Sequence, residues 1–305
     1  MARYSSGGLS SGMKITALIY ALSLFIVLYI TGHGLKLLNT ELLIRSVKQN
    51  GINYDAFRSF EVTEQMLKTS KQRMDHVLKQ NSVLDRKMYM DSIGYLTFCI
   101  MASDYRSEDF GKFDEAIFLR GIPKIAGTPG FQELYKYYLA ILTDITYFPV
   151  PRVEADYKDI TYTDTWYGLR KYGGNRRHEG TDLMDPNNIR GFFPIISMTD
   201  GVVENMGWLD KGGYRIGIRG KSGAYFYYAH LNSYAPGLKA GDEVIAGQLL
   251  GFMGDSGYGP EGTVGMFDVH LHMGIYVSTD SGEMSVNPYW VLKMLEDNRT
   301  SYTFE

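Results

Sequence analysis

The sequence contains a single cysteine and almost no net charge, and both scarcities exclude classes of protein. With only Cys99 among its 305 residues, the chain has neither an intramolecular disulfide framework nor a zinc cluster built on thiolates, which needs at least two of them. Lys and Arg number 31 against 34 Asp and Glu, a formal charge of −3. Proteins that bind nucleic acid usually carry a basic excess or stripe. No nucleic-acid partner is therefore predicted, and Cys99 is expected to be a small buried residue.

Charge is also missing from one long stretch near the N-terminus. No charged residue lies between Lys14 and Lys36, a mostly apolar gap of 21 positions. A helix of that length spans about 30 Å, the thickness of the hydrocarbon core of a bilayer. The alternatives are a buried core helix, which rarely lacks a polar stripe over this length, and a signal peptide, whose apolar region is shorter and precedes a cleavage site. We predict a transmembrane anchor at residues 15–35 and a cytoplasmic tail at residues 1–14.

Glycine is scarce in the first half of the chain and frequent in the second. Residues 1–150 hold 11 of the 34 glycines. Residues 36–148 are predicted to be a helical stalk or regulatory region, with apolar side chains at helical spacing. Three helices are expected in it: one ending at Asn50, one over residues 84–102, and one after Pro129-Gly130 with an apolar face through Leu134, Tyr138, Ile141, Leu142 and Ile145.

The pattern changes after Pro149 and Pro151, and residues 149–165 are predicted to be a linker. Residues 166–297 then show short apolar runs between glycine turns, such as YRIGIR, AYFYYAHL and HLHMGIYV. Short runs at this spacing are typical of antiparallel strands. We therefore predict a C-terminal antiparallel β domain over residues 166–297, followed by a C-terminal tail at residues 298–305.

Four of the six histidines fall in this β domain. His178 precedes Asp182 by four residues in HEGTD, His230 ends a predicted strand, and His270 and His272 form HLH. Alternate residues of a strand share a face, so the last two imidazoles should point together over an open surface. Leu271, Met273, Ile275 and Val277 should then point into the core. His33 and His76 lie outside the β domain and are not expected to be ligands.

Imidazole and carboxylate groups are good zinc ligands, and a catalytic zinc commonly keeps three protein ligands and a water. His178, Asp182 and one histidine of the HLH pair would complete such a set. Each spacing alone is a weak signal, since HxxxD and HxH both occur often without a metal. Their occurrence together in one β domain indicates a metal site.

The order of these motifs resembles the M23 family of zinc metallopeptidases, the lysostaphin-type and LytM-type peptidoglycan endopeptidases. HEGTD is similar to the family's HxGxD signature, YYAHL to its middle YxHL element, and HLH to its terminal HxH. The intervening GLKAGDEVIAGQLLGFMGDSG is similar to a glycine-rich loop of the family. The resemblance covers about residues 165–295 and implies a LytM-like antiparallel β-sheet fold.

Carried over residue by residue, the resemblance implies that His178, Asp182 and His272 bind one Zn²⁺ per chain. It also implies that His270 and His230 are the catalytic histidines, one as general base and one stabilising the oxyanion; which imidazole has which role stays open. The implied function is an endopeptidase that hydrolyses peptide cross-links or stem peptides of bacterial peptidoglycan through a zinc-activated water. The substrate would place the β domain outside the cytoplasm, a topology that the flanking charges alone leave open.

The chain departs from the family pattern in two places. The stretch GYGPEGTVGMFDVH, residues 257–270, is longer than the usual connection into HLH and is expected to reshape one wall of the groove. Gly274 replaces the glutamate that often closes the family's HLHFE. Four aromatic residues are candidates either for the peptide groove or for packing at a domain edge: Trp166, Tyr167, Tyr172 and Tyr258. Arg176 and Arg177 are candidates for binding a substrate carboxylate or for a solvated loop.

Two other functions fit the same motifs. One is a membrane-anchored, non-catalytic assembly or scaffold module of the same fold, for example a sporulation channel-type component. The other is a carboxypeptidase that removes terminal D-Ala. The partners expected are the peptidoglycan peptide, the lipid bilayer through the N-terminal helix, and a regulatory or partner protein on the helical region.

Overall fold

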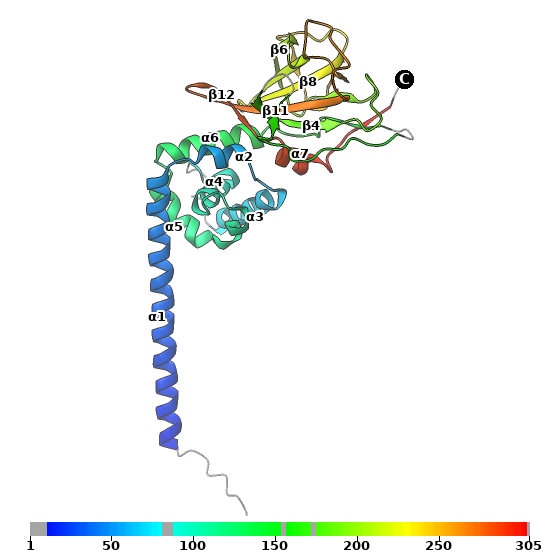
Figure 1. Cartoon of the computed structure of the whole chain (residues 1–305). Helices are drawn as coiled ribbons and strands as arrows, with labels where there is room; N and C mark the ends of the chain where they lie inside the picture. Colours follow the sequence, from blue (N-terminus) through cyan, green and yellow to red (C-terminus); the bar gives the residue numbers. More distant parts are fainter. Residues whose placement is uncertain (1–10, 81–87, 154–156, 172–174, 304–305) are drawn as a thin grey trace, which may run out of the picture.

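The chain forms one long helix, a packed helical region and a β-sheet region (Figure 1). The computed structural model describes residues 11–80, 88–153, 157–171 and 175–303. Most of the predicted tail at residues 1–14 and the end of the predicted tail at residues 298–305 lie outside these ranges.

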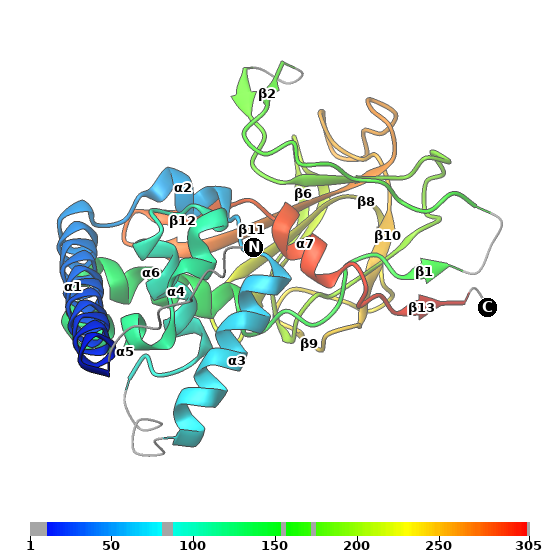
Figure 2. The ribbon, with the colours of Figure 1, turned by 90° about the horizontal axis from the view of Figure 1, so that it is seen from below.

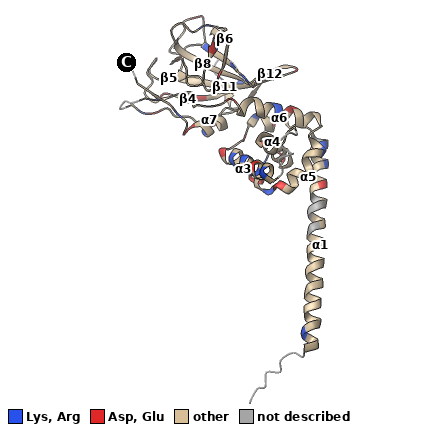
Figure 3. Cartoon of the chain, turned by 180° about the vertical axis from the view of Figure 1, so that it is seen from behind, with Lys and Arg blue, Asp and Glu red and all other residues tan. Residues whose placement is uncertain are grey.

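Helix α1, Ser11–Asn50, joins the predicted anchor and the helix after it without a break. Its 40 residues correspond to a length of about 60 Å. The window Ser11–Gly32 has a mean hydropathy of 2.1, and no part of it is buried against the protein. Figure 3, in which the ribbon is coloured by residue type, shows almost no charged residue along this half of the helix. Among the described residues it is the one helix long and apolar enough to cross a membrane. A soluble core helix would be covered, so the exposure argues against that alternative.

The helical region is a packed body rather than an extended stalk. Helix α4, Ser92–Ala102, is buried from Gly94 onwards and forms its centre. Figure 2 shows this region between α1 and the strands, and the buried side chains of Ile44 and Val47 attach the end of α1 to it. The elements around α4 are α2 (Tyr54–Ser59), α3 (Glu64–Gln80), η2 (Ser107–Lys112), α5 (Glu115–Ile125) and α6 (Pro129–Leu142).

The helix predicted over residues 84–102 is wrong at its start. Asp91 caps α4, its carboxylate accepting a hydrogen bond of 2.7 Å from the backbone N–H of Gly94. An N-cap aspartate accepts a hydrogen bond from an amide that the first helical turn leaves unpaired. The position of Asp91 therefore marks the start of the helix at Ser92. Residues 84–87 lie outside the described residues. Cys99 is fully buried in this helix, as predicted.

The predicted antiparallel β region is confirmed as a nine-stranded sheet, in which β12, β11, β8, β7, β6 and β9 are successive neighbours. Strand β4 pairs with β11, and β10 pairs with both β8 and β5. The strands are β4 (Thr181–Met184), β5 (Pro194–Ile196), β6 (Gly201–Leu209), β7 (Gly213–Gly220), β8 (Tyr225–Tyr234), β9 (Glu243–Val244), β10 (Leu249–Met253), β11 (His270–Thr279) and β12 (Gly282–Val286).

Segments expected to be a linker and a tail pair with each other. Strand β1, Arg152–Val153, runs parallel to β13, Ser301–Tyr302. Arg299 donates hydrogen bonds to the carbonyl oxygens of Val150 and Pro151. The helix α7, Tyr289–Leu295, leads into this pairing, and a second small sheet joins β2 (Leu169–Arg170) to β3 (Arg176–Arg177). The two segments therefore have defined positions beside the sheet.

Arg58 of α2 joins the helical region to the sheet region. Its guanidinium donates to the carbonyl oxygen of Ser285 at 3.0 Å and to the Glu179 carboxylate at 2.9 Å. The backbone carbonyl oxygen of Arg58 accepts a hydrogen bond from the backbone N–H of Asn287 at 2.7 Å. The side chain is 18% exposed. Since Glu179 lies in the HEGTD loop, this contact connects α2 directly to the segment that carries His178 and Asp182.

We expect Arg58→Ala to lower the free energy of unfolding by about 1–3 kcal/mol, because the half-buried groups it bonds lose their charged donor. Urea unfolding followed by circular dichroism measures this. Arg106→Ala is the matched control, since that arginine is exposed and forms an ion pair within one turn. Equal stability of the Arg58 variant and the control would contradict the proposed coupling of the two regions.

Candidate active site

Strand register brings the predicted metal ligands together. On β11, His272 lies opposite Asp182 of β4 on one side and Ala229 of β8 on the other. His178 precedes β4, and its backbone N–H donates to the carbonyl oxygen of Gly168 at 2.9 Å. As predicted, Leu271, Met273, Ile275 and Val277 are buried on the other face of β11. The core therefore holds the strand that carries the imidazoles.

Three potential ligand atoms form a small triangle. Asp182 Oδ1 lies 3.1 Å from His178 Nε2 and 2.9 Å from His272 Nδ1, and these two nitrogens are 3.2 Å apart. Ligands at about 2.0–2.1 Å from a tetrahedral zinc would be separated by about 3.3 Å. The donor set and its spacing therefore fit a single zinc ion.

The ligands are electrostatically suited to bind a cation. Burial alone would raise the pKa of Asp182, but hydrogen bonds from His178 and His272 outweigh it and hold the pKa well below the usual range. Burial lowers the pKa of His272. An ionised carboxylate and a neutral imidazole are the forms that a metal requires.

His270 lies at the edge of this triangle, with its Nε2 3.8 Å from Asp182 Oδ1. Its Nδ1 is 2.7 Å from the backbone carbonyl oxygen of Asp268. A carbonyl only accepts, so Nδ1 carries the proton. In the neutral ring, Nε2 is then an unprotonated acceptor on the side of the predicted ligand Asp182.

His230 reaches the site because β8 is irregular at that residue. Regular alternation would place its side chain on the core face, with Phe226 and Tyr228. Instead, its φ is 63°, and the register of β8 shifts against β7 and against β10 near this position. Such bulges redirect side chains near active sites. The Nδ1 of His230 donates to the carbonyl oxygen of Ser256 at 2.8 Å, and burial, followed by the charges of His270 and His272, lowers its pKa.

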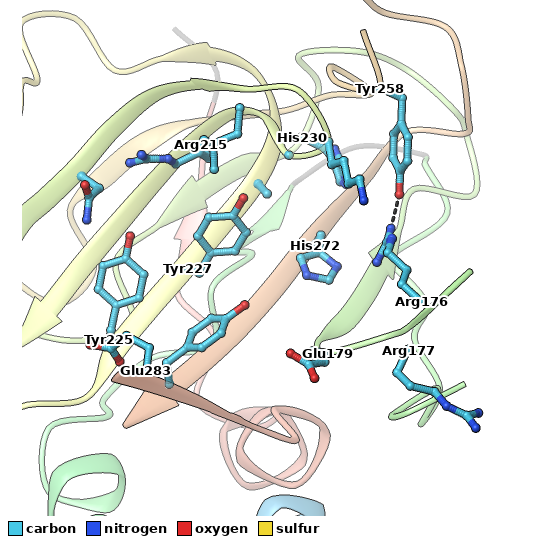
Figure 4. A pocket seen from close by; sticks show the side chains of 16 residues that line it. Arg176, Arg177, Glu179, Arg215, Tyr225, Tyr227, His230, Tyr258, His272 and Glu283 are labelled. Carbon is cyan, nitrogen blue, oxygen red and sulfur yellow. Dashed lines mark hydrogen bonds between the residues drawn. The ribbon is translucent and has the colours of Figure 1, made fainter. Parts of the chain in front are cut away.

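The prediction that the imidazoles of His270 and His272 lie over an open surface is wrong for His270, and the imidazole of His230 beside it is covered as well. His230 and His270 are only 6% and 8% exposed. The long segment 257–270 covers them: the Phe267 ring lies 4.6 Å from His230 and 5.0 Å from His270, and Tyr258 stacks on His230. All five predicted site residues line a hollow of about 140 Å³. The insertion therefore forms a wall of the site. The guanidinium of Arg176 donates a hydrogen bond to the hydroxyl of Tyr258 in this wall (Figure 4).

The aromatic candidates divide between the two expected roles. Tyr258 lines the hollow, whereas Trp166 and Tyr167 lie against the guanidinium of Arg58, with their ring centroids 5.7 Å and 5.1 Å away. Those two rings therefore pack at the edge between the regions. Tyr172 lies outside the described residues.

Two residues that contact the predicted ligands were not predicted from the sequence. Arg170 donates to Asp182 Oδ2, and the Thr165 hydroxyl lies 2.9 Å from His178 Nδ1. Partners of this kind orient metal ligands. Neither residue belongs to a motif, and only the pairing of β2 with β3 brings Arg170 near the ligands. The sequence carried no signal for them.

Two glycines leave room for side chains of the site. A Cβ on Gly180 would collide with the His272 imidazole and lie 2.7 Å from the carbonyl oxygen of Met273. A Cβ on Gly274, where the family often has glutamate, would lie 2.8 Å from the Tyr276 ring. The ring of Tyr276 therefore occupies the space that a longer side chain at position 274 would need.

Gly180→Ala is expected to lower zinc affinity by about 10-fold or more, because the added methyl displaces His272 and misplaced ligands bind metal poorly. Competition with a zinc-binding dye measures the affinity. Gly127→Ala is the control in the exposed turn after α5, since its φ lies outside the left-handed region and no described atom lies within 4 Å of its Cβ position. Unchanged zinc affinity in the Gly180 variant would contradict the proposed role of His272.

Comparison with known proteins identifies the family that this region resembles. The model of peptidase family M23 matches residues 176–288. An L-Ala–D-Glu endopeptidase of Bacillus subtilis is 43% identical over 166 residues, which cover 54% of this chain and 48% of the relative. A glycyl-glycine endopeptidase of Staphylococcus capitis, ALE-1, is 30% identical over 42% of this chain and 32% of its own length. The chain thus spans about half or less of these curated relatives.

A crystal structure from Ruminococcus gnavus, assigned as a glycyl-glycine endopeptidase LytM, extends the similarity beyond the sheet. It is 39% identical, with a TM-score of 0.67, over 86% of this chain and 99% of the other. This coverage is greater than the peptidase segment alone and includes helical residues. The chain therefore belongs to peptidase family M23.

Proposed function

We propose that this protein is a zinc-dependent endopeptidase that cleaves peptides of bacterial peptidoglycan. The observation that carries the proposal is the triangle of His178, Asp182 and His272 ligand atoms, with two further imidazoles beside it. The endopeptidase names of the relatives support the same reaction class. Family members that serve as scaffolds would not need all five side chains.

In this proposal, His178, Asp182 and His272 hold the zinc. The bound ion supplies Lewis-acid activation of a water molecule and of the scissile carbonyl. Arg170 and Thr165 keep the carboxylate and the His178 ring oriented. The ligand geometry is thus set by residues on β2, β4 and β11 together with the segments that precede β2 and β4.

His270 is the proposed general base. Its Nδ1–H is held by the Asp268 carbonyl, so Nε2 is free to accept the proton of the attacking water and to return it to the leaving amine. The rings of His230 and His270 are 4.7 Å apart. His230 is held neutral, with Nε2 as an acceptor. It can donate to an oxyanion only after it takes up a proton, which the developing negative charge favours.

We further propose that residues 15–35 anchor the protein in the membrane and that the sheet region lies outside the cytoplasm, where peptidoglycan is found. The exposed apolar half of α1 supports the anchor. The half of α1 beyond it packs on α4 and α5, so the anchor and the peptidase region would be joined by a rigid helix. Residues 36–148 are proposed as the regulatory region, linked to the site through Arg58.

The test is incubation of the purified protein with zinc and peptidoglycan, followed by mass analysis of the products. Endopeptidase activity predicts new amino termini inside the stem or bridge peptides, absent with His178→Ala. Release of D-Ala alone would instead indicate a carboxypeptidase. A protein that binds no stoichiometric zinc and releases nothing would favour the scaffold role.

A further inference from the structure

A larger groove adjoins the proposed metal site and reaches well beyond it. It has a volume of about 650 Å³. The groove meets the proposed metal site at His230 and at the proposed ligand His272. From there it extends across β8 to β7. Figure 4 shows Arg215, Tyr225 and Tyr227 on one side of His272, and Arg176 and Tyr258 on the other.

The charges that line this groove are not balanced. Its two carboxylates are paired with arginines of other elements: Glu179 with Arg58 at 2.9 Å, and Glu283 with Arg219 at 2.8 Å. Four cations also line the groove: Arg176, Arg177, Lys211 and Arg215. Among the residues that the structure describes, none of these four has a carboxylate within ion-pair distance. The groove is therefore suited to an anionic ligand.

Arg215 is the cation with the clearest need for a partner. Its Nε and Nη1 are buried and have no hydrogen-bond partner among the residues that the structure describes. A guanidinium has five N–H donors and no acceptor, and leaving such donors unpaired in a buried position is unfavourable. A carboxylate matches the planar fork of a guanidinium in a way that few other groups do.

The sheet register places Arg215 level with the proposed metal site. His272 of β11 lies opposite Ala229 of β8. On the other side of β8, Tyr214 of β7 pairs with Leu231, and Arg215 is the next residue of β7. Neighbouring strands are about 4.8 Å apart, so two strand spacings, about 10 Å, separate the backbones of Arg215 and His272. The small Ala229 lies between them and lines the groove. A peptide bound across it would reach both side chains.

We infer that Arg215 is a specificity-determining residue that binds a free carboxylate of the peptide substrate, one or two residues from the bond that is cut. The ligand class is an acidic peptide rather than a run of glycines, which has no side-chain carboxylate. This inference rests on the proposed function and narrows its substrate class. The curated relatives differ in this respect, since one is named for cleavage at an L-Ala–D-Glu bond and the other for cleavage at a glycyl-glycine bond.

The test compares two peptides that differ only in one charge. The first is L-Ala–D-Glu–L-Lys–D-Ala, and the second has a carboxamide in place of the free carboxylate of D-Glu. Binding to the full chain, freed of metal by chelation so that nothing is cut, is measured by titration calorimetry. We expect the wild-type protein to bind the acidic peptide about tenfold or more tightly than the amide. Arg215→Gln should reduce this preference to within about twofold, with binding of the amide unchanged.

Two further variants show whether Arg215 itself is responsible. Lys211→Gln removes a cation from the rim of the same groove and should leave most of the preference intact. Arg215→Lys keeps the charge without the planar fork and should give an intermediate preference. Equal binding of both peptides by the wild-type protein would overturn the inference. So would a preference that survives Arg215→Gln, or one that Lys211→Gln abolishes equally.

Zinc-loaded protein then separates this inference from the proposed function. If the acidic peptide binds preferentially but neither peptide is cut, Arg215 still recognises a carboxylate and the proposed function fails. If both peptides are cut and bound equally, the proposed function stands and the role of Arg215 is refuted.

Discussion

Asp182→Ala is expected to lower zinc affinity by more than about 100-fold and to remove peptidase activity. This carboxylate contacts both histidine ligands, at 3.1 Å and 2.9 Å. Loss of a direct ligand should exceed the 10–100-fold cost of losing an outer partner. Without it, two imidazoles remain to hold the ion, together with the repelling guanidinium of Arg170. Zinc per chain after dialysis, together with the dye competition, measures the change.

Asp280→Ala is the control for this loss, since that carboxylate is exposed in the turn between β11 and β12. We expect it to keep the wild-type zinc content and rate. Were the Asp182 variant to retain one zinc per chain with wild-type affinity, the metal would have to lie elsewhere and the assignment of the triangle would fail.

His270→Ala is expected to reduce the rate of peptide cleavage by about 10²–10⁴-fold while the zinc content stays at one per chain. The His270 imidazole lies beside the three proposed ligands and is not one of them. Its Nδ1 bonds the carbonyl oxygen of Asp268, and its Nε2 lies 3.8 Å from Asp182 Oδ1. Removing it therefore removes proton transfer and leaves the three ligand atoms in place. Single-turnover cleavage of a peptide substrate and metal analysis of the same sample separate the two effects.

The comparison variant is His76→Ala. His76 is an exposed histidine of α3 that pairs with Glu115, far from the sheet in sequence and in contacts. It should behave as wild type. A His270 variant that cuts at the wild-type rate would show that another group, with His230 the first candidate, takes the proton.

Local patterns in the sequence were sufficient for much of the fold. The alternation in HLHMGIYV correctly predicts four buried side chains on one face of β11, because the period of a strand is a local property. The five candidate site residues could be named because they stand in ordered motifs, and the structure brings them together around one hollow. The apolar stripe of α6 is also largely confirmed: Leu134, Tyr138 and Ile141 are buried.

Features that depend on long-range contacts were not predictable in this way. The left-handed φ of His230 arises from bulges against two neighbouring strands. Arg170 and Arg215 become neighbours of the site only through strand pairing, and Arg58 meets Glu179 across 121 positions of sequence. Ile145 was placed on a helix that ends at Leu142. The features of His230, Arg170, Arg215 and Arg58 concern what packs against an element, which its own sequence does not encode, whereas Ile145 concerns the position of a helix end.

The most direct test of a zinc peptidase centre is the release of amino groups from purified peptidoglycan by the same protein sample in three states. These are the protein as purified, the protein after chelation, and the protein after zinc is returned. The ligand triangle predicts that release stops on chelation and recovers with about one equivalent of zinc. Release that continues unchanged in the chelated protein would contradict the account.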